Sequence, residues 1–432
     1  MVYENSLTFA RHLDATDSLK GFRDRFHLPR VNGQEAIYFC GNSLGLQPKT
    51  ARLAVEKEMH HWQERAVEGH FTGDQPWLAY HKQFKEPVAR LVGAQPDEVV
   101  VMNNLTTNLH LMLVSFYRPT RQRFKILVEA GAFPSDQYAV ESQVKLHGYQ
   151  PAEAVVEISP RAGECTLRTE DICQAIRDQR DSVALVLFGG INYYTGQLFD
   201  LPAIARAAHE AGAFVGFDLA HAAGNVPLRL HDWGADFAVW CTYKYLNSGP
   251  GGVAGAFVHA QHARNASLPR LAGWWGYDET TRFGMKKGFV PTPGADGWQL
   301  SNGSILLMAV HKAALDVFEE AGMENLRQKS RQLTGYLEYI LDHQNGTADT
   351  AIRILTPRNP EERGCQLSLL VEREGRRLFD TLAANGIIGD WREPNVIRLS
   401  PAPLYNTFEE VYRVGKVLAE TAGYPAAKRA VV

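Results

Sequence analysis

The sequence predicts an α/β protein with a mostly parallel sheet in a large domain and a smaller α+β domain at the C-terminal end. Between residues 98 and 258, short apolar runs alternate with amphipathic helical stretches, which is typical of parallel strands covered on both faces. Residues 269–303 break this rhythm with a long segment rich in Gly, Trp and Pro. A shorter set of expected strands and helices follows this segment, and it forms the smaller domain.

The expected elements follow from the apolar spacing. Strands are predicted at 36–40, 98–102, 124–128, 154–158, 183–188, 213–217, 237–240 and 255–258, and later at 351–355, 367–371 and 396–399. Helices are predicted at 50–66, 77–92, from 105 onward, 305–321, 376–385 and at the C-terminal end. We therefore expect an N-terminal arm over 1–35, a large domain over 36–310 and a small domain over 311–432.

Composition narrows the class of protein. The chain has 432 residues, 45% hydrophobic and 22% charged, with a net charge of -3, which is ordinary for a soluble globular protein. No basic face is evident, so we expect neither nucleic acid nor a membrane surface as a partner. The five cysteines are odd in number and contain no CxxC pair, so the sequence suggests no metal site and no disulfide framework. With no signal peptide or long apolar run, we expect a cytoplasmic protein.

Two strand ends carry an acid and an amine. The run 212–217 ends on Asp218, and the run 236–243 ends on Lys244. Each residue is common alone, as a strand-end acid or a surface lysine. Together they suit pyridoxal 5'-phosphate (PLP), because a lysine holds its aldehyde as a Schiff base and a carboxylate keeps its pyridine nitrogen protonated.

Three neighbouring stretches could complete such a site. Leu105 and Thr106 follow a strand and open a helix, where free N–H groups and hydroxyls suit a phosphate, although a plain helix cap fits equally well. The stretch from Phe133 through Pro134 and Ser135 to Asp136 also follows a strand, so Phe133 could stack on a pyridine ring or the stretch could be an ordinary turn. Tyr243 beside Lys244 could donate a proton.

Residues further along the chain offer weaker signals. Trp274 and Asn302 lie in the irregular segment, where they could reach the cofactor or serve loop packing. Arg398 stands inside an apolar strand, and a buried arginine normally has an anionic partner. That partner could be the α-carboxylate of a substrate or an internal Asp or Glu.

Taken together, the chain resembles the kynureninases, which are fold type I PLP enzymes of the class V aminotransferase group. The resemblance covers nearly the whole chain and rests on motifs at matching order and spacing: Gly41-Asn-Ser-Leu-Gly-Leu-Gln-Pro-Lys, Phe133-Pro-Ser-Asp, Asp218-Leu-Ala-His, Tyr243-Lys-Tyr-Leu-Asn, Gly273-Trp, Ser301-Asn and Ile397-Arg-Leu-Ser-Pro-Ala-Pro-Leu-Tyr. It implies that the stretches above line the cofactor site together with His221, Trp274 and Asn302. It also implies a homodimer with active sites at the interface, with Trp274 supplied by the partner chain.

The implied reaction is hydrolysis of L-kynurenine or 3-hydroxykynurenine to an anthranilate and L-alanine, in tryptophan breakdown and de novo NAD synthesis. Lys244 would move the Cα proton, Asp218 would stabilise the protonated ring, and Tyr243 or Lys244 would protonate the product. The resemblance further places His70, Ser43 and Asn302 near the aryl end of the substrate, although His70 could instead cap a helix or face solvent. In one departure, Gly189 stands where the family tends to have Ser or Thr.

Two other functions could also fit this sequence. A cysteine desulfurase would need a reactive cysteine on a mobile loop, and Cys365 is the only loose candidate. A non-catalytic PLP-binding protein would share the scaffold, but it would have no need of both Lys244 and Arg398. A nicotinamide dehydrogenase is disfavoured, because the stretch 249–254 lacks an immediately preceding strand and contains a proline.

Overall fold

The computed structural model describes residues 2–265, 267–344 and 352–422. Its largest element is a seven-stranded sheet in the order β4-β10-β9-β8-β7-β5-β6. The strands are β4 (Val99–Met102), β5 (Lys125–Glu129), β6 (Val155–Ile158), β7 (Val183–Gly189), β8 (Phe214–Asp218), β9 (Phe237–Cys241) and β10 (Ala254–Val258). Strand β10 runs antiparallel to both of its neighbours, β4 and β9, and the pairs formed among β9, β8, β7, β5 and β6 are all parallel. The predicted mostly parallel sheet is confirmed.

Helices cover both faces of this sheet. They are α4 (Leu105–Phe116), α5 (Pro134–Leu146), α6 (Pro151–Ala154), α7 (Thr169–Asp178), α8 (Leu201–Glu210) and α9 (Leu230–Trp233). Successive residues of a strand enter different cores, so in β5 Leu127 packs with the core on the side of α7 and α8, while Val128 packs with α4 and α5. Burial on both faces explains why these strands read as continuous apolar runs.

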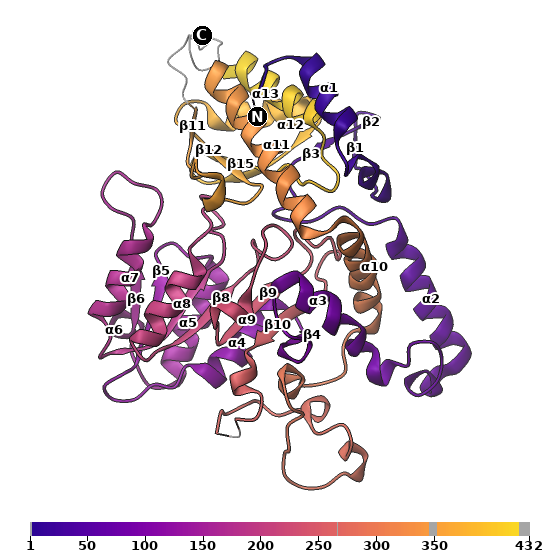
Figure 1. The fold of residues 1–432 in the computed structure, drawn as a ribbon, viewed down its shortest axis with the longest axis vertical. Coiled ribbons are helices and arrows are strands. Elements are labelled where there is room, and N and C mark those ends of the chain that lie inside the picture. The colour runs from indigo at the N-terminus through magenta and orange to yellow at the C-terminus, as the bar shows by residue number, and fades with distance from the viewer. Residues whose placement is uncertain (1, 266, 345–351, 423–432) are drawn as a thin grey trace, which may run out of the picture.

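A smaller α+β unit follows, as predicted (Figure 1). Its antiparallel sheet has the order β11-β12-β15-β14. The elements are β11 (Ile352–Ile354), β12 (Leu367–Val371), α12 (Gly375–Ala384), β13 (Ile387–Ile388), β14 (Asp390–Arg392), β15 (Val396–Leu399) and α13 (Phe408–Ala422), preceded by α11 (Met323–Gln344). The N-terminal helix α1 (Leu7–Thr16) packs Ala10 and Leu13 into this core, and β13 pairs with β3 (Ile37–Tyr38). The two ends of the chain therefore build one unit.

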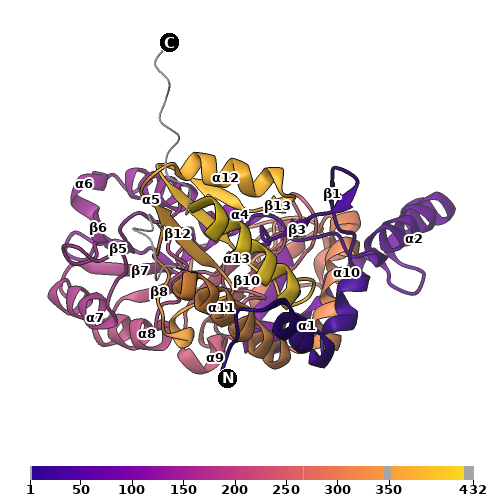
Figure 2. The ribbon, with the colours of Figure 1, turned by 90° about the horizontal axis from the view of Figure 1, so that it is seen from above.

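The remaining elements link the two units or extend from them. They are η1 (Lys20–Arg25), β1 (Arg30–Val31), β2 (Gln34–Glu35), α2 (Thr50–Arg65), η2 (Ala66–His70), η3 (Trp77–Phe84), α3 (Lys85–Val92), η4 (Pro96–Glu98), η5 (Ala260–His262), η6 (Trp274–Gly276), η7 (Arg282–Gly284), η8 (Ala295–Trp298), α10 (Ile305–Ala321) and η10 (Pro360–Glu362). Figure 2 shows α2 projecting from the body beside α10. Among the described residues, no helix is long and apolar enough to cross a membrane.

The predicted domain boundary at residue 310 falls inside α10. A continuous helix moves as one piece, so a division of the chain belongs at its end. We propose that the large unit ends at Gly322, which follows α10 with a φ of 75°.

Candidate active site

The candidate site lies where parallel strands end. Glu129, Gly189 and Asp218 are the last residues of β5, β7 and β8, which are neighbours in the sheet, and Lys244 follows the end of β9. A pocket of about 80 Å³ lies between these ends. Its lining is Leu105, Thr106, Glu129, Phe133, Ser135, Asp136, Gly189, Ile191, Tyr193, Asp218, Ala220, His221, Tyr243 and Lys244. The carboxyl end of an open α/β sheet is where such folds bind ligands.

The amine of Lys244 lies close to two side chains that were expected from the sequence to line the cofactor site. Its Nζ lies 3.0 Å from Nε2 of His221 and 5.7 Å from the ring centroid of Phe133. Burial, and then the positive charge of Lys244, lower the pKa of His221 well below its ordinary value. A neutral imidazole can accept a hydrogen bond from Nζ at Nε2, which leaves its proton on Nδ1. That Nδ1 is buried and has no partner among the described residues.

Three carboxyl groups surround the inner end of the pocket. Asp218 is 8% exposed and accepts a hydrogen bond from the amide of Ala220 at 2.7 Å. Burial raises its pKa, and burial together with the charge of Asp218 raises the pKa of Asp136 still further. Oδ1 of Asp136 has no hydrogen-bond partner among the described residues. Asp136 therefore favours its protonated form, and the pair suits a cation placed against Asp218.

Glu129 is a site residue that the sequence analysis missed. It is 5% exposed, and its Oε2 accepts a hydrogen bond from Nδ2 of Asn192 at 3.1 Å. Burial raises its pKa to about 7. The available signal was its place at the end of an apolar strand, like Asp218. A Cβ on Gly189 would lie 2.8 Å from Oε1 of Glu129, so a larger residue at position 189 would displace this carboxyl group.

Hydroxyl groups and two helix N-termini form the outer end of the pocket. Thr106 in the first turn of α4 and Ser135 in the first turn of α5 place their Oγ atoms 3.0 Å apart. Pro134 opens α5, a position that needs no N–H donor. Phe133, just before it, is 42% exposed and presents an open aromatic face. N-terminal N–H groups and hydroxyls are the donors that a phosphate requires.

These features fit PLP on the grounds of donor chemistry. The pocket offers an amine, a buried carboxylate for a ring nitrogen, an open aromatic face and a hydroxyl pair at two helix N-termini. The unpartnered Nδ1 of His221 and Oδ1 of Asp136 are polar atoms that a bound polar group would satisfy. Tyr243 stays protonated here, because burial raises the pKa of its phenol.

Arg398 lies in β15 and has an internal carboxylate as its partner, one of the two alternatives that the sequence left open. It is 1% exposed, its Nη1 donates to the carbonyl of Tyr193 at 2.6 Å, and its Nη2 pairs with Asp390. Ser43 also donates to Asp390. Within one chain, then, Ser43 belongs to the arginine cluster, and the expected grouping of Ser43 with His70 and Asn302 does not occur.

His70 and Asn302 meet elsewhere, in an open cavity of about 470 Å³ next to α10. Its other lining residues are Glu58, Trp62, Trp77, Ser304, Ile305, Leu306 and Leu307. The ring of His70 packs edge-on against Trp77 at 5.4 Å. Trp274 is 45% exposed and contacts Phe283 at 5.6 Å between ring centroids. Neither Asn302 nor Trp274 lines the lysine pocket of its own chain.

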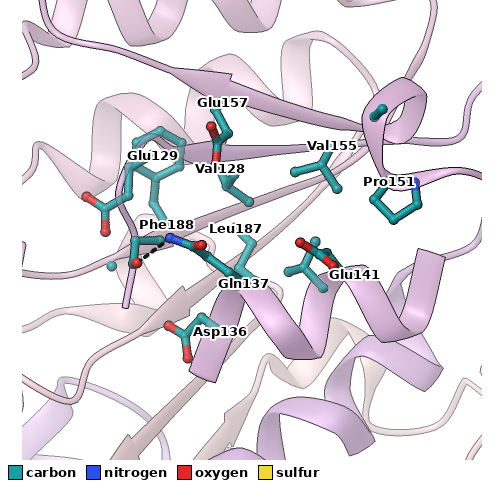
Figure 3. Close-up of a pocket in the computed structure, with 14 residues that line it drawn as sticks. Val128, Glu129, Asp136, Gln137, Glu141, Pro151, Val155, Glu157, Leu187 and Phe188 are labelled. Atoms are coloured by element: carbon teal, nitrogen blue, oxygen red, sulfur yellow. Dashed lines mark hydrogen bonds between the residues drawn. The ribbon is translucent and has the colours of Figure 1, made fainter. Parts of the chain in front are cut away.

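A larger cavity of about 300 Å³ adjoins the lysine pocket. Figure 3 shows Glu129 and Asp136 on one side of it and Glu141 and Pro151 on the other. Glu129, Asp136 and Gly189 line both cavities. The lining of the larger cavity contains no lysine to hold an aldehyde, so the amine chemistry belongs to the smaller pocket.

The structure also tests whether Cys365 could serve as the reactive cysteine of a cysteine desulfurase. Cys365 is fully buried, and burial raises the pKa of its thiol to about 12. A persulfide-forming cysteine must be an accessible thiolate. Cys365 is neither accessible nor ionised at neutral pH.

Comparison with known proteins identifies the family of this chain. Residues 37–364 match the family model described as Aminotransferase class-V, and residues 326–418 match the Kynureninase C-terminal domain. The chain is 54% identical to a kynureninase of Flavobacterium psychrophilum, with 97% of this chain and 98% of the relative covered. It is 57% identical to a kynureninase of Myxococcus xanthus, with 96% and 97% covered.

Solved structures support the fold alone, because their sequences are distant. An apo cysteine desulfurase of Thermococcus onnurineus NA1 is 18% identical with a TM-score of 0.73, covering 90% of this chain and 94% of the other. A cysteine desulfurase of Escherichia coli is 18% identical with a TM-score of 0.74, covering 93% and 98%. With the matched family models and the full-length relatives, the chain belongs to the kynureninase family, within the class V aminotransferase group of PLP-dependent proteins.

Proposed function

We propose that this chain hydrolyses the Cβ–Cγ bond of L-kynurenine and 3-hydroxy-L-kynurenine, giving anthranilate or 3-hydroxyanthranilate and L-alanine. The reaction serves tryptophan catabolism and de novo NAD synthesis, and we place it in the cytoplasm. The observation that carries the proposal is that Lys244 and Asp218 line one strand-end pocket, while the buried Arg398 binds the carbonyl of Tyr193, another residue of that lining. An amino acid substrate presents an amine and a carboxylate, and Lys244 and Arg398 are the groups that suit them.

Each residue then has a task. Bound PLP supplies an electron sink for charge that develops on the substrate. Nζ of Lys244 takes the proton from Cα, and the neutral His221 beside it accepts a hydrogen bond that orients this amine. Asp218 pairs with the ring nitrogen, because a carboxylate favours the protonated form of its neighbour. Tyr243, protonated at neutral pH, gives the proton that completes alanine.

We further propose a homodimer whose active sites lie at the interface. Large apolar side chains are exposed on α2 and at the start of α10, among them Trp62 at 58% and Leu306 at 37%. Exposed apolar groups of this kind mark association surfaces. In the dimer, Trp274 and Asn302 of one chain complete the lysine pocket of the other.

The aryl end of the substrate belongs to His70 and Asn302, which share one cavity. Both side chains can donate or accept a hydrogen bond, so they suit a ring hydroxyl better than a bare C–H edge. We propose 3-hydroxykynurenine as the better substrate, with a preference of roughly 5- to 150-fold in kcat/KM, since one polar contact is worth about 1–3 kcal/mol. An unchanged preference in His70→Phe with Asn302→Thr would show that these side chains do not contact the ring.

The deciding experiment gives purified holoenzyme three substrates: L-kynurenine, 3-hydroxy-L-kynurenine and L-cysteine. Anthranilate fluorescence and sulfide release are followed in parallel, with dithiothreitol present, because a desulfurase holds its sulfur as a persulfide until a reductant frees it as sulfide. We expect both kynurenines to be cleaved and cysteine to yield no sulfide. Sulfide without anthranilate would replace the proposal with a desulfurase.

A further inference from the structure

Arg398, which lies near the lysine pocket, is paired with a carboxylate of its own chain. Asp390 stands directly opposite Arg398 across the antiparallel pair β14 and β15, and Nη2 of Arg398 donates to its Oδ2. Nη1 is fixed by the carbonyl of Tyr193. Nε is buried and has no partner among the described residues, so the guanidinium has a donor that the chain leaves unused.

Asp390 has partners of its own besides Arg398. Ser43 donates to its Oδ2, as does Nη2 of Arg392 at 3.2 Å, and Nε of Arg392 lies 3.1 Å from Oδ1. Burial would raise the pKa of Asp390, but the charge of Arg398 and these hydrogen bonds hold it below its ordinary value. The carboxylate is therefore ionised at neutral pH and is shared between two arginines.

Arg398 also contacts a residue that lines the lysine pocket. Tyr193, whose carbonyl holds it, lines that pocket and packs its ring edge-on against Phe133 at 5.3 Å. His221, in contact with Lys244, has a pKa lowered in part by the charge of Arg398. An amino acid whose amine reaches Lys244 thus brings its carboxylate toward a guanidinium that Asp390 already engages.

We propose that Asp390 competes with the α-carboxylate of the substrate for Arg398. In the free protein Asp390 holds Arg398 in position, and when substrate binds Asp390 releases Nη2 of Arg398. The exchange leaves no buried charge unpaired, because Asp390 keeps Arg392 and Ser43. A buried carboxylate without such a second partner would resist the exchange, since an uncompensated buried charge is costly. Asp390 is therefore a positioning residue. This proposal rests on the proposed function, in which Arg398 binds the α-carboxylate of the substrate.

The test measures binding in place of turnover. Isothermal titration calorimetry of the holoenzyme compares L-alanine with L-alaninamide, which has the same amine and no carboxylate. Asp390→Asn removes the competing charge, so we expect L-alanine to bind roughly 10-fold more tightly, as one charge-assisted hydrogen bond allows. L-Alaninamide should bind as it does to the wild type, and the melting temperature should fall because Arg398 loses its ionic partner.

Arg392→Gln is the opposing variant. Arg392 is 35% exposed, so its loss is tolerable, and without it Asp390 has only Arg398 as a charged partner. L-Alanine should then bind more weakly. If Asp390→Asn does not fold, Ser43→Ala removes the other partner that Asp390 keeps after the exchange, so L-alanine should again bind more weakly, by a smaller factor than in Arg392→Gln.

Weaker binding of L-alanine to a folded Asp390→Asn protein, or equal changes for both ligands, would overturn the proposal. If the wild type binds both ligands equally, Arg398 is not a carboxylate site and the proposed substrate contact falls as well. If alanine binding follows the predicted pattern but kynurenine is not cleaved, only the proposed function fails.

Discussion

At the scale of single residues, identical carboxyl groups take different roles because their surroundings differ. Asp218 accepts a backbone hydrogen bond that favours its ionised form, whereas Asp136 faces Asp218 with an unpartnered oxygen. Asp390, also largely buried, is ionised because two arginines surround it. Each carboxyl group therefore binds a cation, holds a proton or neutralises an arginine according to its neighbours.

Asp218→Asn should keep PLP but slow the chemistry. The amide cannot favour a protonated ring nitrogen, so the electron sink weakens while the other contacts of the cofactor remain. We expect kcat to fall by roughly 10²-fold or more, about 2.7 kcal/mol of transition-state stabilisation. Absorbance spectra measure PLP content and stopped-flow kinetics measure proton removal. Near-normal turnover would assign the role to another group.

Arg398→Lys keeps the charge but loses the planar fork. The lysine cannot bind the carbonyl of Tyr193, Asp390 and a substrate carboxylate together, so KM for kynurenine should rise with PLP content unchanged. The melting temperature should fall as well, because the internal ion pair weakens. Steady-state kinetics and thermal unfolding separate the two effects. A variant that is insoluble and never loads PLP would favour a purely structural arginine.

At the scale of elements, residues next to the strands form the active site and also hold neighbouring strands and helices together. Just before β9, Asp236 ties that strand to α8 and to β8: it accepts hydrogen bonds from the amide of Val215 at 2.8 Å and pairs with Nε2 of His209 at 3.1 Å. Hydrogen bonding to Asp236 raises the pKa of His209 above its ordinary 6.5. Burial would raise the pKa of Asp236, but His209 and His262 lower it.

The pair formed by His209 and Asp236 makes the free energy of unfolding depend on pH. A group whose pKa is raised by folding stabilises fully below its unfolded pKa, and this contribution disappears as the pH rises through the folded value. His209→Gln should therefore lower the free energy of unfolding at about pH 6, and the difference should shrink toward roughly pH 8. Urea unfolding across this range measures it, with the exposed His60→Gln as control. A constant difference would mean that His209 contributes without its charge.

The predicted and observed elements differ in an informative way. Long apolar strands were found from the sequence because burial on both faces leaves a strong pattern. The predicted helix over 77–92 is a 3₁₀ helix as far as Phe84 and an α-helix afterwards. Strand β14 was missed, since it is short, polar and half-buried. Asp390 was missed with it, because only the antiparallel register places it opposite Arg398.

At the scale of the whole molecule, the proposed active site takes residues from two chains. Lys244 and Asp218 line one pocket, and Arg398 binds the carbonyl of Tyr193, which lines it as well. The short motifs that contain these residues could be found from the sequence. His70, Asn302 and Trp274 lie outside this pocket, and sequence spacing could not say which chain they serve. The exposed apolar surface on α2 and α10 supplies the physical reason to expect a second chain there.

Subunit mixing tests this arrangement. Lys244→Ala and Trp274→Ala homodimers each carry a defect in every site. If Lys244 and Trp274 of one site come from different chains, a mixed dimer contains one intact site, and equal mixing should restore about a quarter of the wild-type sites. Activity after mixing unfolded and refolded variants is the readout. No recovery, with mixed dimers present by native mass spectrometry, would place both residues in one chain.

The central claim is that Lys244 directs hydrolysis of kynurenine in this protein. The most direct measurement quantifies anthranilate and L-alanine from L-kynurenine, for the wild type and for Lys244→Ala, each reconstituted with PLP. We predict equal amounts of the two products from the wild type and none from the variant. PLP-loaded wild type that releases neither product, or Lys244→Ala that releases both at the wild-type rate, would contradict the claim.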